Sequence, residues 1–163
     1  MRHVVGLSSA KGEEQRRSLD AKNSIRFDSG HFQTLGYLML LAPAFDHYAQ
    51  RDTGIGIFSI NIEFSLCGKD LVDTLEILLR LESEIADKPD RWKPLLGTIQ
   101  RPGQNQEPIE PLLFKHRAIG LIENLRALTL KAMSQGKCVV YGNGVFYRQL
   151  CGIKLPPGTI VYS

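Results

Sequence analysis

The chain has 163 residues, of which 43% are hydrophobic and 23% are charged, and its formal net charge is +3. This length and composition predict one globular domain, residues 1–163, that buries its own core, and they exclude a disordered chain. The longest apolar run, residues 35–45, contains Pro43 and is shorter than the roughly 20 residues that span a bilayer, so we expect no membrane contact.

The cysteines and the first residues bear on the compartment. Three cysteines, Cys67, Cys138 and Cys151, are odd in number and widely spread, a pattern that predicts no disulfide framework. Residues 1–7 contain too short an apolar run for a secretory signal. We therefore expect a cytoplasmic protein.

The first third of the chain predicts little regular structure before one helix. Residues 3–7 predict a short strand at a sheet edge. Residues 10–30 are polar and mixed in charge, which favours either a mobile loop or a short surface helix. Apolar residues recur at helical spacing over 35–49, and we expect Pro43 to kink or split that helix because proline removes a backbone donor.

A change of period then marks a strand followed by a helix. Residues 57–66 alternate between large apolar and polar side chains, which predicts a strand with one buried face. After Gly68 the apolar residues recur at helical spacing over 70–87. Asp70 is the expected N-cap of this helix.

Residues 88–111 contain five prolines and two glycines and show no sustained period. A connection of this length without regular structure is uncommon in a compact domain and often carries partner contacts. We expect Trp92 to be anchored on the body of the protein and residues 97–110 to be mobile.

The longest helix is predicted over residues 111–135, where an apolar stripe follows the spacing of a packed helix. Pro111 suits the first turn of this helix. Gly136 suits the left-handed position just beyond its end.

The end of the chain predicts strands. Residues 138–150 form a β-hairpin signal around Asn143-Gly144, and this register sets Cys138 opposite Gln149 rather than Cys151. Residues 159–162 predict a last strand. The whole pattern predicts an α+β fold, an antiparallel or mixed sheet with a C-terminal hairpin, covered on one face by about three helices.

No motif with a known chemistry is complete. In residues 6–12 a lysine precedes the last glycine and no hydroxyl follows, the reverse of the order that a phosphate loop requires. No histidine is spaced with a second histidine or cysteine as in a zinc site, so we expect neither metal nor cofactor. The one catalytic hypothesis is a small hydrolase-like cleft lined by His31, Asp46 and His47.

Charge is distributed unevenly along the chain. Residues 61–90 hold eight acids and three bases, a net charge of −5, whereas residues 91–163 hold ten bases and three acids, a net charge of +7. The acidic helix either neutralises this basic half or leaves part of it exposed as a contact surface. The candidate contact residues are Arg91, Trp92, Lys93, Arg101, Lys115, Arg117 and Arg148.

Three functional hypotheses follow, since these residues match no family motif set. The first is a non-catalytic binding or assembly module that acts through protein contacts, by self-association or within a larger complex. The alternative is a nucleic-acid-binding protein that uses the basic half, 91–163, on the phosphate backbone, because cations beside aromatic rings suit phosphates and bases. The third is the hydrolase-like enzyme.

Overall fold

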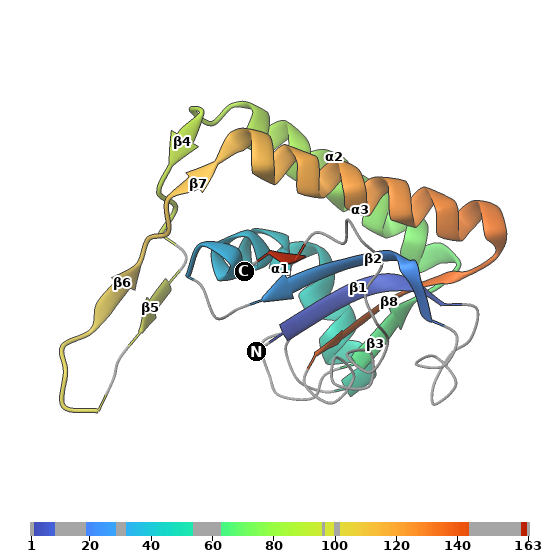
Figure 1. Ribbon diagram of the computed structural model, residues 1–163, viewed down its shortest axis with the longest axis horizontal. Coiled ribbons are helices and arrows are strands. Elements are labelled where there is room, and N and C mark those ends of the chain that lie inside the picture. Colours follow the sequence, from blue (N-terminus) through green and yellow to red (C-terminus); the bar gives the residue numbers. More distant parts are fainter. Residues whose placement is uncertain are drawn as a thin grey trace.

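The computed structural model describes residues 2–8, 19–28, 32–53, 63–95, 97–99, 102–143 and 161–162. In these ranges helices and strands are both present, which confirms the predicted α+β class (Figure 1). The helices are α1 (Phe32–Thr53), α2 (Lys69–Ala86) and α3 (Lys115–Gln135). The strands are β1 (Arg2–Ser8), β2 (Leu19–Asp28), β3 (Glu63–Leu66), β4 (Arg91–Trp92), β5 (Gly97–Ile99), β6 (Glu107–Ile109), β7 (Leu113–Phe114), β8 (Cys138–Asn143) and β9 (Val161–Tyr162).

The main sheet is mixed and has the strand order β3-β8-β1-β2-β9. All neighbouring strands are antiparallel except β2 and β9, which are parallel. Strand β1 therefore lies inside the sheet, between β8 and β2, and its predicted place at an edge is wrong. The reason is non-local, because both of its partners come from segments that the period of β1 alone does not identify.

Strand β2 replaces the loop or surface helix that the polar composition of residues 10–30 predicted. Residues 19–28 pair with β1 along its length, with one register shift between Gly6 and Leu7. The signal in the sequence is the alternation of Ile25 and Phe27 with polar neighbours, which the charges nearby obscure. Residues 10–18 and 29–30 lie outside the described residues.

Strands β3 and β8 carry the centre of the core. Phe64 faces Tyr141 and Leu66 faces Val139 across the ladder, and all four side chains are buried. The rings of Phe64 and Tyr141 stack with centroids 4.9 Å apart, and Phe45 of α1 lies 6.1 Å from Tyr141. The predicted strand 57–66 is thus confirmed at 63–66, while residues 57–62 lie outside the described residues.

Strand β8 is the first strand of the predicted C-terminal hairpin. It has hydrogen-bonded neighbours on both sides, β1 and β3. The second half of the predicted hairpin, residues 144–150, lies outside the described residues. The predicted last strand is present as β9.

Helix α1 runs unbroken from residue 32 to 53, so Pro43 does not split it. The buried residues Leu41, Phe45 and Tyr48 on either side of the proline recur at spacings of four and three and pack into one core cluster. Packing of this face outweighs the single backbone hydrogen bond that proline removes.

The starts of α2 and α3 differ from the prediction, although their lengths and stripes agree with it. The N-cap of α2 is Gly68, with φ of 54° and no side-chain cap, so Asp70 lies in the first turn and is not the cap. Helix α3 begins at Lys115 because residues 113–114 belong to strand β7. Gly136 adopts the predicted left-handed conformation, with φ of 61°.

Helices α2 and α3 lie side by side along their lengths (Figure 1). Arg126 of α3 forms an ion pair with Glu82 of α2 in the part-buried seam. The acidic helix therefore neutralises part of the basic half, as one of the two alternatives predicted. Among the described residues, no helix combines the length and the apolar character that crossing a membrane requires.

A disulfide joins Cys67 and Cys138, although the odd number and wide spread of the cysteines predicted no disulfide framework. The β3–β8 register explains the pair, because Leu66 faces Val139 and the next residues along each strand are the two cysteines. The bond closes a loop with a sequence separation of 71 residues, which in the chain-entropy model stabilises the fold by about 4 kcal/mol. This loop contains α2, α3 and everything between them.

Candidate functional site

Residues 87–114, which we call the arm, connect α2 to α3 and contain regular structure that the sequence did not predict. Strand β4 pairs with β7 near the helices, and β5 pairs with β6 farther out. Figure 1 shows β5 and β6 projecting away from the helices and the main sheet. The prolines and glycines of this segment do not make it one irregular loop, because Gly97 begins β5 and Pro108 lies within the short strand β6. The predicted mobility of residues 97–110 stays a prediction.

The base of the arm is fastened to α1. Pro111 and Leu113 are buried, and a Cβ added at Gly36 of α1 would lie 2.6 Å from Cγ of Pro111. The backbone N–H of Phe114 donates a hydrogen bond to the Tyr37 hydroxyl, at 3.0 Å. Pro111 therefore requires a glycine opposite it and has no place in the first turn of α3, where the sequence analysis put it.

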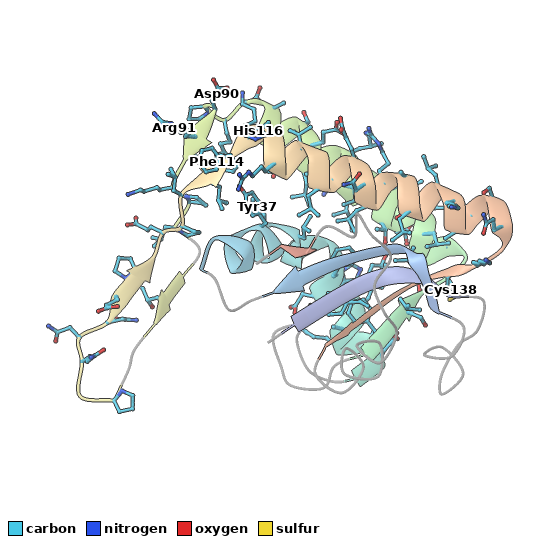
Figure 2. The ribbon with its side chains drawn as sticks, viewed as in Figure 1. Tyr37, Asp90, Arg91, Phe114, His116 and Cys138 are labelled. Carbon is cyan, nitrogen blue, oxygen red and sulfur yellow. A yellow bond between two sulfur atoms is a disulfide. The ribbon has the colours of Figure 1, made fainter. Side chains whose placement is uncertain are left out.

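The β4–β7 ladder brings together two basic stretches that are far apart in the sequence. Arg91 pairs with Phe114 and Trp92 with Leu113, and the backbone N–H of Lys115 donates to the carbonyl of Asp90 at 2.9 Å. Five predicted contact residues thus gather with Phe114 in what we call the arm-base cluster: Arg91, Trp92, Lys93, Phe114, Lys115 and Arg117. Figure 2 labels Arg91 and Phe114 of this cluster. The other two, Arg101 and Arg148, lie outside the described residues.

The side chains of the arm-base cluster divide into anchors and exposed cations. Trp92 is half-buried and packs against the main core cluster, which confirms its predicted anchoring. Its neighbours Arg91 and Lys93 are exposed and, among the described residues, have no ion-pair partner. The guanidinium of Arg117 lies over the ring of Phe114, 5.3 Å from its centroid.

Lys115 has a different role from the one predicted. Its ammonium group donates to the carbonyl of Ala86 at 3.1 Å, at the end of α2. A cation at the C-terminus of a helix satisfies an unpaired carbonyl and stabilises the helix dipole. Lys115 is therefore a capping residue for α2 and is less available for an external anion than Arg91 or Lys93.

A surface groove of about 490 Å³ lies at the arm-base cluster, lined by Asp90, Arg91, Phe114, Lys115, His116 and Ile119. It offers an aromatic face, an apolar side chain and cations, which suits a planar or anionic group of a partner. The described lining also holds a carboxylate, that of Asp90, and an imidazole, that of His116.

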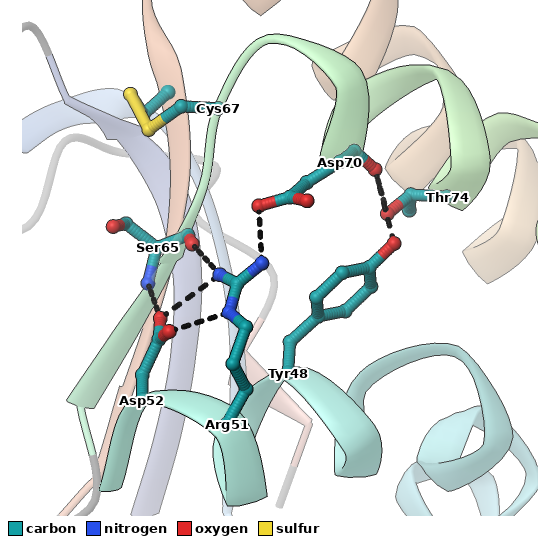
Figure 3. Close-up of polar contacts among 8 residues, drawn as sticks. Tyr48, Arg51, Asp52, Ser65, Cys67, Asp70 and Thr74 are labelled. Atoms are coloured by element: carbon teal, nitrogen blue, oxygen red, sulfur yellow. Dashed lines mark hydrogen bonds and ion pairs between the residues drawn. A yellow bond between two sulfur atoms is a disulfide. The ribbon is translucent and has the colours of Figure 1, made fainter.

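A polar network at the other end of α1 joins α1, β3 and α2 (Figure 3). Arg51 bonds the carboxylates of Asp52 and Asp70, at 2.7 and 2.8 Å, and these two acids raise the pKa of Arg51 above its usual value. Burial is the main reason why the pKa of Tyr48 is also raised. Both groups keep one protonation state at neutral pH, and their bonds to Asp70 join α1 to the start of α2.

The residues of the hydrolase-like hypothesis do not form a described cleft. Asp46 accepts a hydrogen bond from Gln50 at 2.7 Å, and His47 is exposed on α1. Neighbouring residues on a helix do not face each other, so Asp46 does not orient His47 as a catalytic acid would. His31 lies outside the described residues. Among the described residues, no three metal-binding side chains gather into a candidate metal site.

The chain was compared with protein-family models, with curated proteins and with solved structures, and no match was found in any of the three. The arm and its base therefore have to be interpreted from their own geometry.

The anchoring of the arm predicts a local effect of Tyr37→Phe. Loss of the hydroxyl leaves the N–H of Phe114 without its acceptor, at a cost of about 1 kcal/mol in the free energy of unfolding. The amide of Phe114 should exchange with solvent faster, as measured by hydrogen exchange. In the control Tyr48→Phe, the same amide should exchange as in the unchanged chain. Equal protection of Phe114 in Tyr37→Phe would show that the arm is not held at this point.

Proposed function

We propose that the chain is a non-catalytic binding module that acts through protein contacts, with the arm as its contact element. The observation that carries this proposal is the exposure of the described side chains of the ribbon that β5 and β6 form, Thr98 among them. Residues 102–108 are all exposed, and β5 and β6 pair only with each other among the described strands. A two-stranded ribbon of this kind is marginally stable in water by itself. A partner that covers it supplies the missing packing.

The edges of the ribbon define how a partner binds. Each of β5 and β6 leaves one edge without a described neighbour, and an extended segment of another chain can add to such an edge through backbone hydrogen bonds. Leu95, at the foot of the ribbon, is 65% exposed and provides an apolar contact beside it. The partner is accordingly an extended protein segment, from another protein or from a second copy of this chain.

The cytoplasmic location also remains a proposal. In a reducing compartment such as the cytoplasm, Cys67 and Cys138 stay mostly as thiols. A disulfide that persists between them would instead indicate an oxidising compartment. If the protein is cytoplasmic, the disulfide therefore forms and is reduced again.

Shortening the arm tests the proposal. In the test variant residues 98–108 are replaced by Gly-Ser, which keeps β4, β7 and the core. The fold and the free energy of unfolding should change little, because the described side chains of this part, Thr98 and residues 102–108, are exposed. Sedimentation velocity of the unchanged chain over a hundredfold range of concentration tests for self-association, and affinity capture from native lysate tests for a protein partner. At least one of the two should show binding by the unchanged chain, and the shortened variant should lose it. The control Leu79→Ser, on the exposed face of α2, should keep it. A strictly monomeric chain that captures nothing, or binding that survives arm shortening, would contradict the proposal.

A second candidate function is nucleic-acid binding, and the gathering of the arm-base cluster favours it. Exposed Arg91 and Lys93 and the Arg117–Phe114 pair combine cations for phosphates with a ring for a base. Both functions use the same part of the molecule, so the two require different tests.

Replacing Arg91, Lys93 and Arg117 with alanine separates the two functions. If three phosphate contacts are lost, the slope of log affinity against log salt for single strands should fall by about 2, since each contact contributes about 0.7. Lys115 is left in place because it caps α2. Fluorescence anisotropy with labelled oligonucleotides measures the slope, and Arg80→Ala, an exposed cation on α2, is the matched control. Nucleic-acid binding is ruled out as the function if the chain binds the oligonucleotides only weakly. It is also ruled out if the affinity changes neither with salt concentration nor with these substitutions.

A further inference from the structure

A second surface groove lies at the end of the α2–α3 pair that is remote from the arm. It has a volume of about 510 Å³ and lies where α2 begins and α3 ends. Its lining includes both disulfide cysteines, the apolar residues Leu71, Ala132 and Met133, and Lys137. The disulfide therefore lies in the wall of a groove of small-molecule size rather than inside the core.

The two sulfur-bearing residues differ in access. Cys138 is only 8% exposed, whereas Cys67 is partly exposed. The two glycines in the lining, Gly68 and Gly136, leave the space beside the bond open, because a Cβ added at either would meet no atom within 4 Å. An incoming group therefore reaches the sulfur of Cys67 first.

The surroundings of Cys67 favour its thiolate form. Cys67 directly precedes the N-cap of α2, which has no side-chain cap, so the positive end of the helix dipole points toward it. The one carboxylate in the first turn, Asp70, is bound by Arg51 at 2.8 Å, so part of its negative charge is compensated by a guanidinium that it shares with Asp52 (Figure 3). Lys69 and Lys137 add positive charge from the same turn and from the groove wall.

We propose that Cys67 and Cys138 form a thiol–disulfide exchange site for a low-mass acidic thiol, with Cys67 forming the mixed disulfide and Cys138 resolving it. The groove has room for such a molecule, and Lys137 provides a cation for its carboxylate. This inference is independent of the function proposed for the arm.

The reaction balances with the disulfide of the same small thiol as oxidant. The Cys67 thiolate attacks one sulfur of the small disulfide, which forms a mixed disulfide and releases one small thiolate. The thiolate of Cys138 then attacks the Cys67 sulfur, closes the protein disulfide and releases the second small thiolate. The two protein thiols lose two electrons and two protons, which the small disulfide takes up as two thiols. Reduction of the bond follows the same steps in reverse.

Glutathione disulfide is the probe for the test, applied to the reduced full chain with Cys151→Ser to remove the third thiol. Intact-mass measurement should show that this chain closes its disulfide and keeps no adduct. With Cys138→Ser added, one glutathione should stay attached, and peptide mapping should place it on Cys67. With Cys67→Ser instead, Cys138 should react at least about tenfold more slowly than Cys67 does, because solvent access and thiolate fraction set the rate of attack.

The charge of Lys137 gives a second readout that a purely structural bond would not show. Lys137→Gln should slow the reaction with glutathione disulfide roughly threefold, the size of an exposed ion pair. It should slow the reaction with the uncharged hydroxyethyl disulfide less, because that reagent loses only the contribution of Lys137 to the Cys67 thiolate and no ion pair, and Arg80→Gln should change neither rate. If Cys138→Ser does not fold, acid quenching of the Cys151→Ser chain during its reaction should trap the adduct on Cys67. The inference is wrong if the folded chain reacts only in denaturant, if both cysteines react equally, or if Lys137→Gln slows both reagents alike.

Discussion

The pairing of β3 with β8 is the constraint on which the rest of the structure depends. Residues 63–66 and 139–142 lie side by side, although about seventy residues separate them, and their buried side chains meet α1 through the stack of Phe64, Tyr141 and Phe45. The chain between β3 and β8 must therefore leave the sheet at the end of β3 and return to it at the start of β8. The chain leaves the sheet along α2, reverses direction in the arm and returns along α3. The disulfide between Cys67 and Cys138 links the two points at which it leaves and re-enters the sheet.

This arrangement explains why contact elements lie at both ends of the helix pair. At the far end the chain turns through short strands fixed to the body by Pro111, Leu113 and the bond from Phe114 to Tyr37, so the ribbon beyond them points outward. At the near end the chain enters α2 and leaves α3 beside two glycines with positive φ, which leaves a groove over the cysteines.

Local patterns in the sequence predicted the elements whose signals are local. The strand ending at Leu66, the helix after Gly68, the stripe of α3 and the left-handed Gly136 all follow from period or turn chemistry and are present. The errors concern pairings between distant segments. The sequence around β1 predicts an edge strand, because no residue near β1 indicates that β8 pairs with it. The cysteine spacing predicts no disulfide framework, because the bond between Cys67 and Cys138 depends on the β3–β8 register. Helix α1 passes through Pro43 because core contacts that the sequence does not display outweigh one lost bond.

The candidate site was predicted in its residue types but not in its geometry. Charge beside aromatic rings predicts Arg91, Lys93 and Arg117 as contact residues, and the β4–β7 ladder brings them together. Lys115, in contrast, is engaged at the end of α2. The ring of Phe114 and the anchor Tyr37 were missed, since each acquires its role from a contact across the fold. The sequence predicts the charge of each residue, because charge is a property of a single side chain. It does not predict the geometry of the site, because that depends on contacts between residues from several elements.

The central claim, the β3–β8 pairing, is tested most directly by mapping the disulfide of the folded, oxidised chain. Protease digestion without reductant, followed by mass spectrometry, identifies which cysteine peptides are linked. The structure predicts a peptide pair that joins Cys67 to Cys138, with Cys151 recovered outside that pair. A native chain in which Cys138 is linked to Cys151, or in which Cys67 and Cys138 both resist oxidation, would contradict the register on which this account depends.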